Sequence, residues 1–312
     1  MKSIYRDMHP ISKIAVTTLV ALSSLLIIMI VSSVLAIPIF GVDSFLQLLT
    51  SSLTIDAANI NLLKYFQLWQ SIGMFIVPAL LLALLFGNSI GEYLSLKKSP
   101  KLVSALLASL IVLCSSPIIN VLGVWNSGME LPSFMSGIEN WMKQSEESAA
   151  QITKLFVFSD SMGGLLYNIF LIALIPAIGE EFLFRGVIQR VLTDWTKNKH
   201  LGIWIAAIFF SAFHLQFYGF IPRVFLGAMF GYLLVWSGNL WLPVIAHFVN
   251  NAAAVIAYHL YNNGAINVDP DELGVGSAYG IAAISSLLVV VVLFYFFYHK
   301  QKKQNLYKEP LL

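Results

Sequence analysis

The feature that most constrains this chain is a series of long apolar runs separated by short charged segments. Of its 312 residues, 58% are hydrophobic and 11% are charged, whereas a soluble domain has about 45–50% apolar and about 25% charged residues. Such a chain needs an apolar solvent, and about 20 consecutive apolar residues cross the hydrocarbon core of a bilayer. We therefore predict an all-α membrane protein, a bundle of about eight transmembrane helices. The candidate spans are roughly 14–38, 66–90, 102–124, 162–190, 202–218, 222–238, 241–261 and 278–298.

The first apolar run follows Lys2, Arg6 and Lys13, as the core of a signal peptide would. It extends from Ile14 to Phe40, which is longer than the roughly 7–15 residues of a signal-peptide core. We therefore expect an uncleaved first transmembrane helix.

The charges between the spans predict the orientation of the bundle. Lys and Arg concentrate in segments 1–13, 91–101, 186–200 and 299–312, and Asp and Glu concentrate in segments 40–65, 129–160 and 262–277. Because short cytoplasmic loops are enriched in Lys and Arg, the basic segments are expected in the cytoplasm. Eight spans with both termini in the cytoplasm satisfy this alternation, whereas an odd number would place one basic tail outside.

No internal repeat or low-complexity tract divides the chain, so we expect a single structural unit. Residues 1–160 are predicted to hold the first three transmembrane helices and an extracytoplasmic loop, and residues 161–312 the remaining five helices with the functional core. The longest hydrophilic stretch, 129–160, carries apolar residues at helical spacing and predicts an interfacial amphipathic helix. Polar residues inside the spans crowd the second half. This asymmetry argues against the alternative of a proton-relaying transporter, because a transporter is expected to have matching interrupted helices in its two halves.

Charge and cysteine content exclude several other classes of protein. A net charge of +2 gives no reason to expect a nucleic-acid partner, so the expected surroundings are the lipid bilayer and a membrane-associated substrate. The single cysteine, Cys114, excludes an internal disulfide framework and is expected to be a small buried hydrophobe. Nothing in the sequence predicts the oligomeric state.

Two adjacent carboxylates lie within or just beneath the membrane in the fourth span, where Glu180, Glu181 and Arg185 form a Glu-Glu-x-x-x-Arg pattern. Ionisable groups inside a bilayer are costly and are functional-site candidates by default. Glu181 and Arg185 are four residues apart and share a helical face, which predicts a structural ion pair. Glu180 is rotated by about 100° and is expected to be a free, desolvated carboxylate suited to proton transfer. The alternative is a charged cluster that only reaches the interface.

Two histidines lie in later spans. His214 follows Phe210 by four residues in the fifth span, and taken alone it could be a hydrogen-bonded residue of the core. His247 and Asn251 are four residues apart in the seventh span and therefore share a helical face. Two hydrogen-bond donors on one face are suited to stabilising an oxyanion, with Asn250 as a weaker candidate. The alternative is a polar clamp between helices.

The predicted depths of these groups agree. Counted from the cytoplasmic ends of their spans, Glu180, His214 and His247 lie about 12–20 Å deep at 1.5 Å per residue. This agreement favours one shared site over three separate structural roles. Two imidazoles and a carboxylate could also bind zinc, but the chain contains no His-Glu-x-x-His stretch. We therefore expect no cofactor, with zinc or another divalent metal as the alternative.

The three motifs resemble those of the CPBP family, the CAAX proteases and bacteriocin-processing enzymes, also called the ABI family. The family pattern is Glu-Glu-x-x-x-Arg, then Phe-x-x-x-His, then His-x-x-x-Asn or Asp. All three occur here in order, and the resemblance covers roughly residues 160–260. The first 150 residues carry no motif.

The resemblance implies an intramembrane endopeptidase that hydrolyses a peptide bond of a membrane-embedded or membrane-anchored peptide or protein. By this analogy Glu180 is the general base, assisted by His214, while His247 and Asn251 stabilise the oxyanion and Glu181 and Arg185 support the site. A metal-free glutamate mechanism is preferred because an amide is a poor zinc ligand. A zinc-dependent version and a non-catalytic immunity or scaffold protein are the alternatives. The substrate, and whether it is prenylated, stays open.

Overall fold

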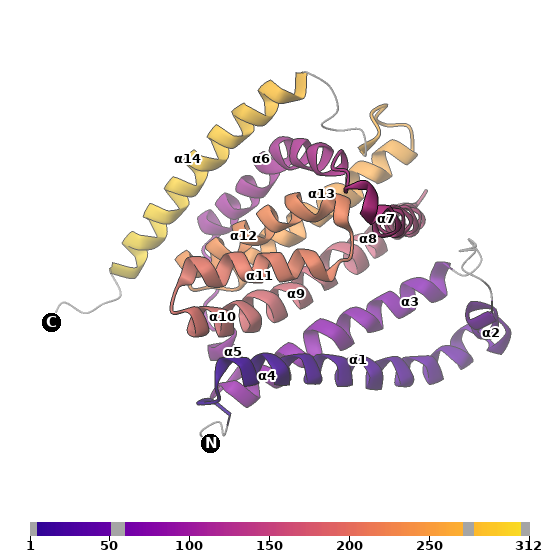
Figure 1. The fold of residues 1–312 in the computed structure, drawn as a ribbon, viewed down its shortest axis with the longest axis horizontal. Helices are drawn as coiled ribbons and strands as arrows, with labels where there is room; N and C mark the ends of the chain where they lie inside the picture. The colour runs from indigo at the N-terminus through magenta and orange to yellow at the C-terminus, as the bar shows by residue number, and fades with distance from the viewer. Residues whose placement is uncertain (1–4, 51–59, 271–277, 307–312) are drawn as a thin grey trace.

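The computed structural model describes residues 5–50, 60–270 and 278–306, and within these ranges the chain forms helices and no strand (Figure 1). The first half contains α1 (Pro10–Phe40), α2 (Val42–Thr50), α3 (Ile60–Ser71), α4 (Val77–Phe86), α5 (Ile90–Tyr93), α6 (Leu102–Ser127) and α7 (Ser136–Val157). The second half contains α8 (Met162–Asn168), α9 (Ile175–Glu180), α10 (Gln189–Thr196), α11 (Lys199–Phe213), α12 (Phe220–Ser237), α13 (Trp241–Asn262) and α14 (Ala278–Leu306). The predicted all-α fold class is confirmed.

Three π-helical segments join some of these helices into longer ones. They are Ile72–Ile76 between α3 and α4, Ile169–Leu174 between α8 and α9, and Glu181–Ile188 between α9 and α10. The first two are followed directly by the helices that contain Pro78 and Pro176 near their starts. Proline lacks the N–H that continues an α-helical ladder, and a π-helical turn is one way in which a helix accommodates such an interruption.

Seven helices within the described ranges are long and apolar enough to cross a membrane. They are Pro10–Phe40, Ile60–Phe86, Leu102–Ser127, Met162–Thr196, Phe217–Ser237, Trp241–Asn262 and Tyr279–Lys303. The remaining predicted span, 202–218, is shorter than expected, because α11 has 15 residues and ends at Phe213. The backbone then turns at Leu215, where φ is 53°, and a residue in this left-handed region cannot continue an α-helix. The predicted and observed boundaries of the other spans differ by at most six residues.

The outermost helices α1 and α14 expose most of their large apolar side chains. The buried residues of α1 are small or weakly polar, namely Thr17, Ala21, Ser24, Ser32 and Ala36, while leucines and isoleucines along it are exposed. On α14, Ile281 is 75% exposed. Small residues at helix contacts and large apolar residues outside are typical of helices that pack together in lipid.

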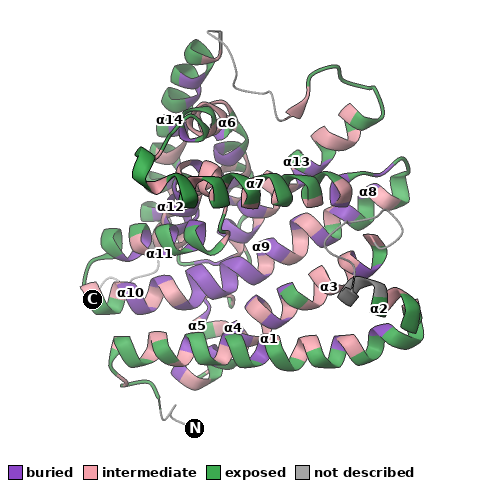
Figure 2. Cartoon of the chain, turned by 45° about the vertical axis from the view of Figure 1, so that its right-hand side comes forward, coloured by how far each residue is buried: buried purple, intermediate pink, exposed green. Residues whose placement is uncertain are grey.

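The helix that runs through α9, Glu181–Ile188 and α10 lies in the middle of the bundle, and Figure 2 shows it as the largest continuous buried element. Its apolar residues pack with those of α4 and α11 in one core cluster that includes Phe75, Phe184 and Phe210. A second cluster joins α6, α12, α13 and α14. The first predicted carboxylates therefore sit on the most enclosed helix of the molecule.

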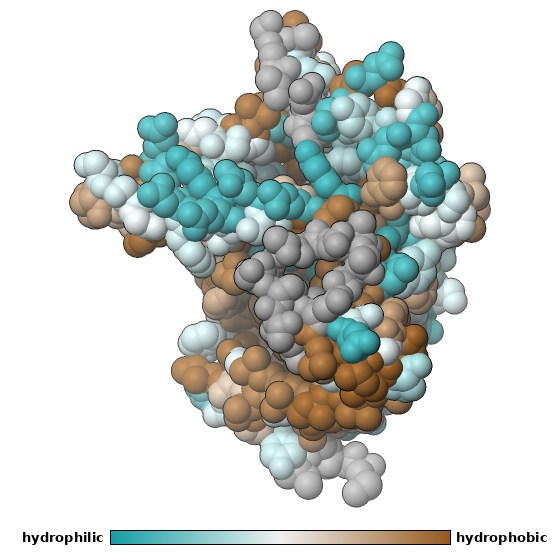
Figure 3. Space-filling model, turned by 90° about the vertical axis from the view of Figure 1, so that its right-hand side faces the viewer, coloured by the Kyte–Doolittle hydropathy of each residue, from teal (hydrophilic) through white to brown (hydrophobic). Residues whose placement is uncertain are grey.

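The amphipathic helix predicted in segment 129–160 is present as α7. Its outer surface is largely hydrophilic and forms a band across the face shown in Figure 3, above an apolar surface. Its Trp141 ring contacts Phe217, with ring centroids 5.4 Å apart. Its predicted position at the membrane interface stays a prediction, as does the cytoplasmic location of both termini.

The turn between α11 and α12 is held by a side chain of α6. Asn126 donates from Nδ2 to the Phe217 carbonyl oxygen at 3.1 Å and accepts at Oδ1 from the Ile221 N–H at 2.8 Å. Ser211 donates to the Phe220 carbonyl oxygen at 2.8 Å. A non-helical turn at membrane depth needs partners of this kind for its backbone.

Candidate active site

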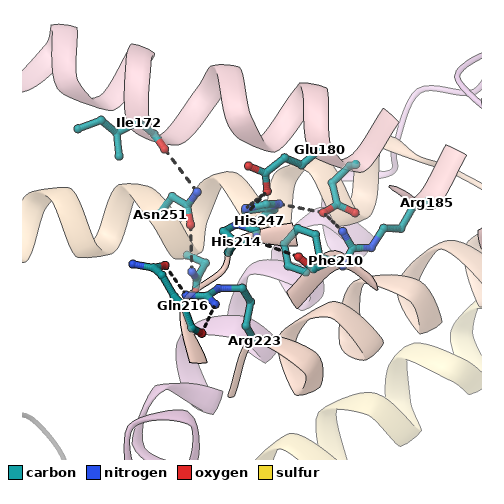
Figure 4. Close-up of polar contacts among 11 residues, drawn as sticks. Ile172, Glu180, Arg185, Phe210, His214, Gln216, Arg223, His247 and Asn251 are labelled. Atoms are coloured by element: carbon teal, nitrogen blue, oxygen red, sulfur yellow. Dashed lines mark hydrogen bonds and ion pairs between the residues drawn. The ribbon is translucent and has the colours of Figure 1, made fainter. Parts of the chain in front are cut away.

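Three helices bring Glu180, His214 and His247 together, as the sequence predicted (Figure 4). Glu180 is the last residue of α9, His214 directly follows α11, and His247 lies in α13. Glu180 Oε2 lies 4.0 Å from His214 Nε2 and 3.8 Å from His247 Nε2. The Glu180 side chain is 12% exposed, so its carboxylate is desolvated yet reachable.

Glu181 and Arg185 form the predicted ion pair, with Arg185 Nη1 2.8 Å from Glu181 Oε1 and both side chains almost fully buried. Arg185 also donates from Nη2 to the Gly227 carbonyl oxygen at 3.1 Å, and its guanidinium lies 4.3 Å from the centroid of the Phe210 ring. A Cβ atom on Gly227 would lie 3.1 Å from both Arg185 Nη2 and Ala207 Cβ. Glycine at this position therefore allows the close approach of α12.

A contact that the sequence did not predict joins Glu181 to His247. Glu181 Oε1 lies 2.8 Å from His247 Nδ1, so one carboxylate oxygen serves both Arg185 and His247. The imidazole of His247 also stacks on Phe230, with ring centroids 5.0 Å apart and an interplanar angle of 16°. Glu181 is thus more than the partner of Arg185, because it also orients one of the histidines that face Glu180.

The Nδ1 atoms of both histidines have acceptors, which determines what their Nε2 atoms can do. His214 Nδ1 lies 2.8 Å from the Phe210 carbonyl oxygen, which can only accept, so Nδ1 must carry the hydrogen. His247 Nδ1 faces the Glu181 carboxylate in the same way. In its neutral form, each imidazole therefore presents an Nε2 lone pair toward Glu180. A water molecule that donates to these atoms would have its oxygen activated as a nucleophile.

Asn251 lies one helical turn beyond His247 on the same helix, as predicted. Its Nδ2 donates to the Ile172 carbonyl oxygen at 3.4 Å, and its Oδ1 accepts from Asn250 Nδ2 at 3.1 Å. Within the described chain its hydrogen bonds are to these two residues, with none to Glu180 or His247. The bond to Ile172 is long, which leaves the amide able to turn toward a substrate oxygen.

The sequence analysis missed Arg223, which Figure 4 places beside His214. Its Nη2 donates to Gln216 Oε1 at 2.7 Å and its Nη1 to the Gln216 carbonyl oxygen at 3.3 Å. Arg223 also interacts electrostatically with Glu180 and His214. A basic residue just inside a predicted span, on the side of the bundle where acidic segments predominate, was the signal that could have identified it.

The residue types at this site are ones that zinc uses, namely two histidines and a glutamate. In the part of the chain that the structure describes, however, no group of three or more His, Cys, Asp and Glu side chains is arranged to hold a metal ion. The described side chains as they lie do not fit a metal ion.

Residues 162–253 match the family model of the Rce1-like type II CAAX prenyl endopeptidases. The predicted family resemblance is confirmed. The matched stretch contains all six of the predicted site residues and two of the three π-helical segments, Ile169–Leu174 and Glu181–Ile188. This match and the seven apolar helices identify the chain as an integral, multi-pass membrane protein.

Two curated bacterial proteins are similar to the same part of the chain. The membrane-embedded CAAX protease MroQ of Staphylococcus aureus is 33% identical over 104 residues, which cover 31% of this chain and 41% of MroQ. The uncharacterized protein YpbD of Bacillus subtilis is 34% identical over 89 residues, which cover 27% of this chain and 42% of YpbD. The similarity thus spans less than half of each relative. No solved structure matches the chain significantly.

Proposed function

We propose that this protein is an intramembrane endopeptidase that hydrolyses a peptide bond of a membrane-embedded or membrane-anchored peptide or protein. The observation that carries the proposal is the approach of two imidazole Nε2 atoms to one Glu180 carboxylate oxygen, at 3.8 and 4.0 Å. This arrangement lies within the stretch that matches a family of endopeptidases. The activity of MroQ, a CAAX protease by its name, supports the same class of reaction.

In the proposed reaction, Glu180 is the general base and His214 helps to hold the water. Glu180 takes one proton from the water while the water oxygen forms a bond to the carbonyl carbon of the substrate. The carbonyl oxygen then carries the negative charge of a tetrahedral intermediate. When the carbon–nitrogen bond breaks, Glu180 returns its proton to the leaving amine, so that the carboxylate is regenerated. Proton transfer of this kind contributes about 10²–10⁴ to a rate.

His247 and Asn251 are proposed to stabilise the oxyanion. Asn251 can do so through its Nδ2 group once the long bond to Ile172 is released. His247 can donate from Nε2 only when that nitrogen carries a hydrogen, and its Nδ1 hydrogen is already directed at Glu181 Oε1. In that role both ring nitrogens of His247 carry a hydrogen. Donors placed in a site with little water are worth far more than the same donors in solution.

The proposal is tested by comparing membrane proteomes of cells that carry the wild-type protein or the Glu180→Gln variant. Glutamine keeps the shape of the side chain but cannot accept the proton, so precursors of the natural substrates should accumulate uncleaved in the variant. Purified wild-type protein in lipid nanodiscs should then cleave those precursors, and Glu180→Gln should be slower by about 10⁴, the upper end for a general base. Identical peptide profiles in the two strains would support the non-catalytic alternative instead.

A further inference from the structure

The two sides of Glu180 differ in how closely they are packed. On one side, the Glu181 and Arg185 side chains are 0% and 1% exposed and pair with each other. On the other side, the His214 side chain is 27% exposed, and Gln216, Arg223, Asn250 and Asn251 are half-buried. The more accessible side of Glu180 is therefore the one on which His214 and Arg223 lie.

Arg223 is a half-buried cation whose hydrogen bonds go to a neutral residue. Among the described residues no carboxylate lies within ion-pair distance of it. Of the five N–H groups of a guanidinium, two have acceptors, and both acceptors are on Gln216. A buried charge held by a neutral group alone is costly, and a cation inside a membrane-spanning helix is retained where it binds something.

Gln216 holds the guanidinium in one orientation. It contacts Nη1 with its backbone oxygen and Nη2 with its side-chain oxygen, so two atoms of one residue fix the plane of the group. The N–H groups that remain are available in a fixed geometry. A planar guanidinium with two free N–H groups matches the two oxygens of a carboxylate.

Glu146 of α7 interacts electrostatically with Arg223 from beyond ion-pair distance. One of its oxygens, Oε2, is buried and has no hydrogen-bond partner. Glu146 is therefore close enough to attract Arg223 but does not satisfy it.

We propose that Arg223, oriented by Gln216, binds a carboxylate of the substrate and thereby sets which peptides are positioned over Glu180. This inference rests on the proposed function and specifies its substrate: a peptide with a carboxylate close to the bond that is cleaved. The carboxylate is either the carboxyl terminus of the peptide or the side chain of an Asp or Glu. Arg223 is a specificity-determining residue in this scheme.

The test measures binding separately from hydrolysis. The full-length protein in phosphatidylcholine nanodiscs is immobilised and offered three pools of heptapeptides with randomised apolar residues. One pool has free carboxyl termini, one has carboxamide termini, and one has carboxamide termini and a single Glu. Bound peptides are counted by mass spectrometry. Cleavage of the same pools is followed in parallel against Glu180→Gln, so a lack of peptidase activity is seen independently of a lack of carboxylate binding.

We expect at least one carboxylate pool to be retained about tenfold better than the carboxamide pool, the lower end for hydrogen bonds between charged groups. The preferred pool identifies the source of the carboxylate. Arg223→Gln should abolish the preference, and Arg223→Lys, which keeps the charge but not the planar fork, should retain part of it. Lys143→Gln is the matched control, because Lys143 is an exposed cation of α7 that pairs with Glu139. It should leave the preference unchanged.

Three results would overturn the proposal. The first is equal retention of all pools by the wild-type protein, which includes retention of none. The second is a preference that persists in Arg223→Gln. The third is that Arg223→Gln reduces the binding of phosphatidylglycerol to the nanodisc-embedded protein while peptide retention is unchanged, which would make Arg223 a contact for lipid headgroups. A further variant, Glu146→Gln, is expected to strengthen the preference for carboxylate peptides, because it removes an anion that competes with the peptide for Arg223.

Discussion

Glu180 has a closed side, formed by Glu181, Arg185 and His247, and an open side, formed by His214 and Arg223. The two sides contain similar residue types in different arrangements. On the closed side, Glu181 Oε1 is shared by Arg185 and His247, and all three side chains are buried. On the open side, His214 and Arg223 are bonded to backbone or neutral groups and are partly accessible. The closed side pairs its charges with one another through Glu181 Oε1, although Glu181 Oε2 is buried without a hydrogen-bond partner. The open side leaves N–H groups of Arg223 unused where a substrate can reach them. This difference separates the residues that hold the site from those that are available to a substrate.

The largest expected difference between the two sides is in stability. Glu181→Gln should lower the free energy of unfolding by about 3 kcal/mol or more, because it leaves Arg185 and His247 buried without their common anion. Glu180→Gln should leave it unchanged or raise it slightly, since it removes a desolvated charge that has no close ion pair. The measurement is unfolding of both variants in mixed micelles. Equal losses of stability in the two would mean that the carboxylates do not have separate roles.

The next largest effect concerns the two oxyanion donors. His247→Ala and Asn251→Ala should each lower turnover by about 10²–10³, the usual consequence of losing one such donor. They should differ in stability, because His247 belongs to the buried cluster while Asn251 is bonded weakly, at 3.4 Å, to the Ile172 carbonyl oxygen. Kinetics on a cleaved precursor, together with unfolding curves, provide the measurement. Wild-type turnover in Asn251→Ala would remove that residue from the catalytic set.

The smallest expected effect is that of metal removal. In the metal-free mechanism, protein stripped with a chelator should retain its turnover, because Glu180 and His214 act on the water without an ion. Activity is measured before stripping, after stripping, and after addition of stoichiometric zinc, with metal content determined on the same samples. Loss on stripping and recovery with zinc would make Glu180, His214 and His247 metal ligands and His247 no longer an oxyanion donor.

The helices could be predicted from the sequence because each depends on a local property. Apolar runs of about 20 residues and alternating charges gave spans that differ from the observed helices by a few residues. The exception, α11, ends where Leu215 adopts a left-handed backbone conformation, which nothing in an apolar run signals. The π-helical segments were not predicted either, since they depend on how neighbouring helices pack around Pro78 and Pro176.

The site residues could be predicted because they are charged or polar residues within apolar spans. That criterion found Glu180, His214 and His247 and their approach to one another. It could not find the bond between Glu181 and His247, because the two residues are 66 positions apart and their contact depends on tertiary packing. Arg223 was overlooked because it lies next to a turn, where a basic residue is ordinarily a solvated one.

The shortness of α11 has a consequence for the supply of water. Its 15 residues span about 22 Å at 1.5 Å per residue, whereas the hydrocarbon layer is about 30 Å thick. A helix that is too short for its bilayer makes the lipid thin around it, and we expect a local depression of the membrane surface over the turn that Asn126 holds. Headgroups and solvent would then reach below the normal level of the interface. The depth of hydrolysis would be set as much by this deformation of the lipid as by the position of Glu180 along its helix.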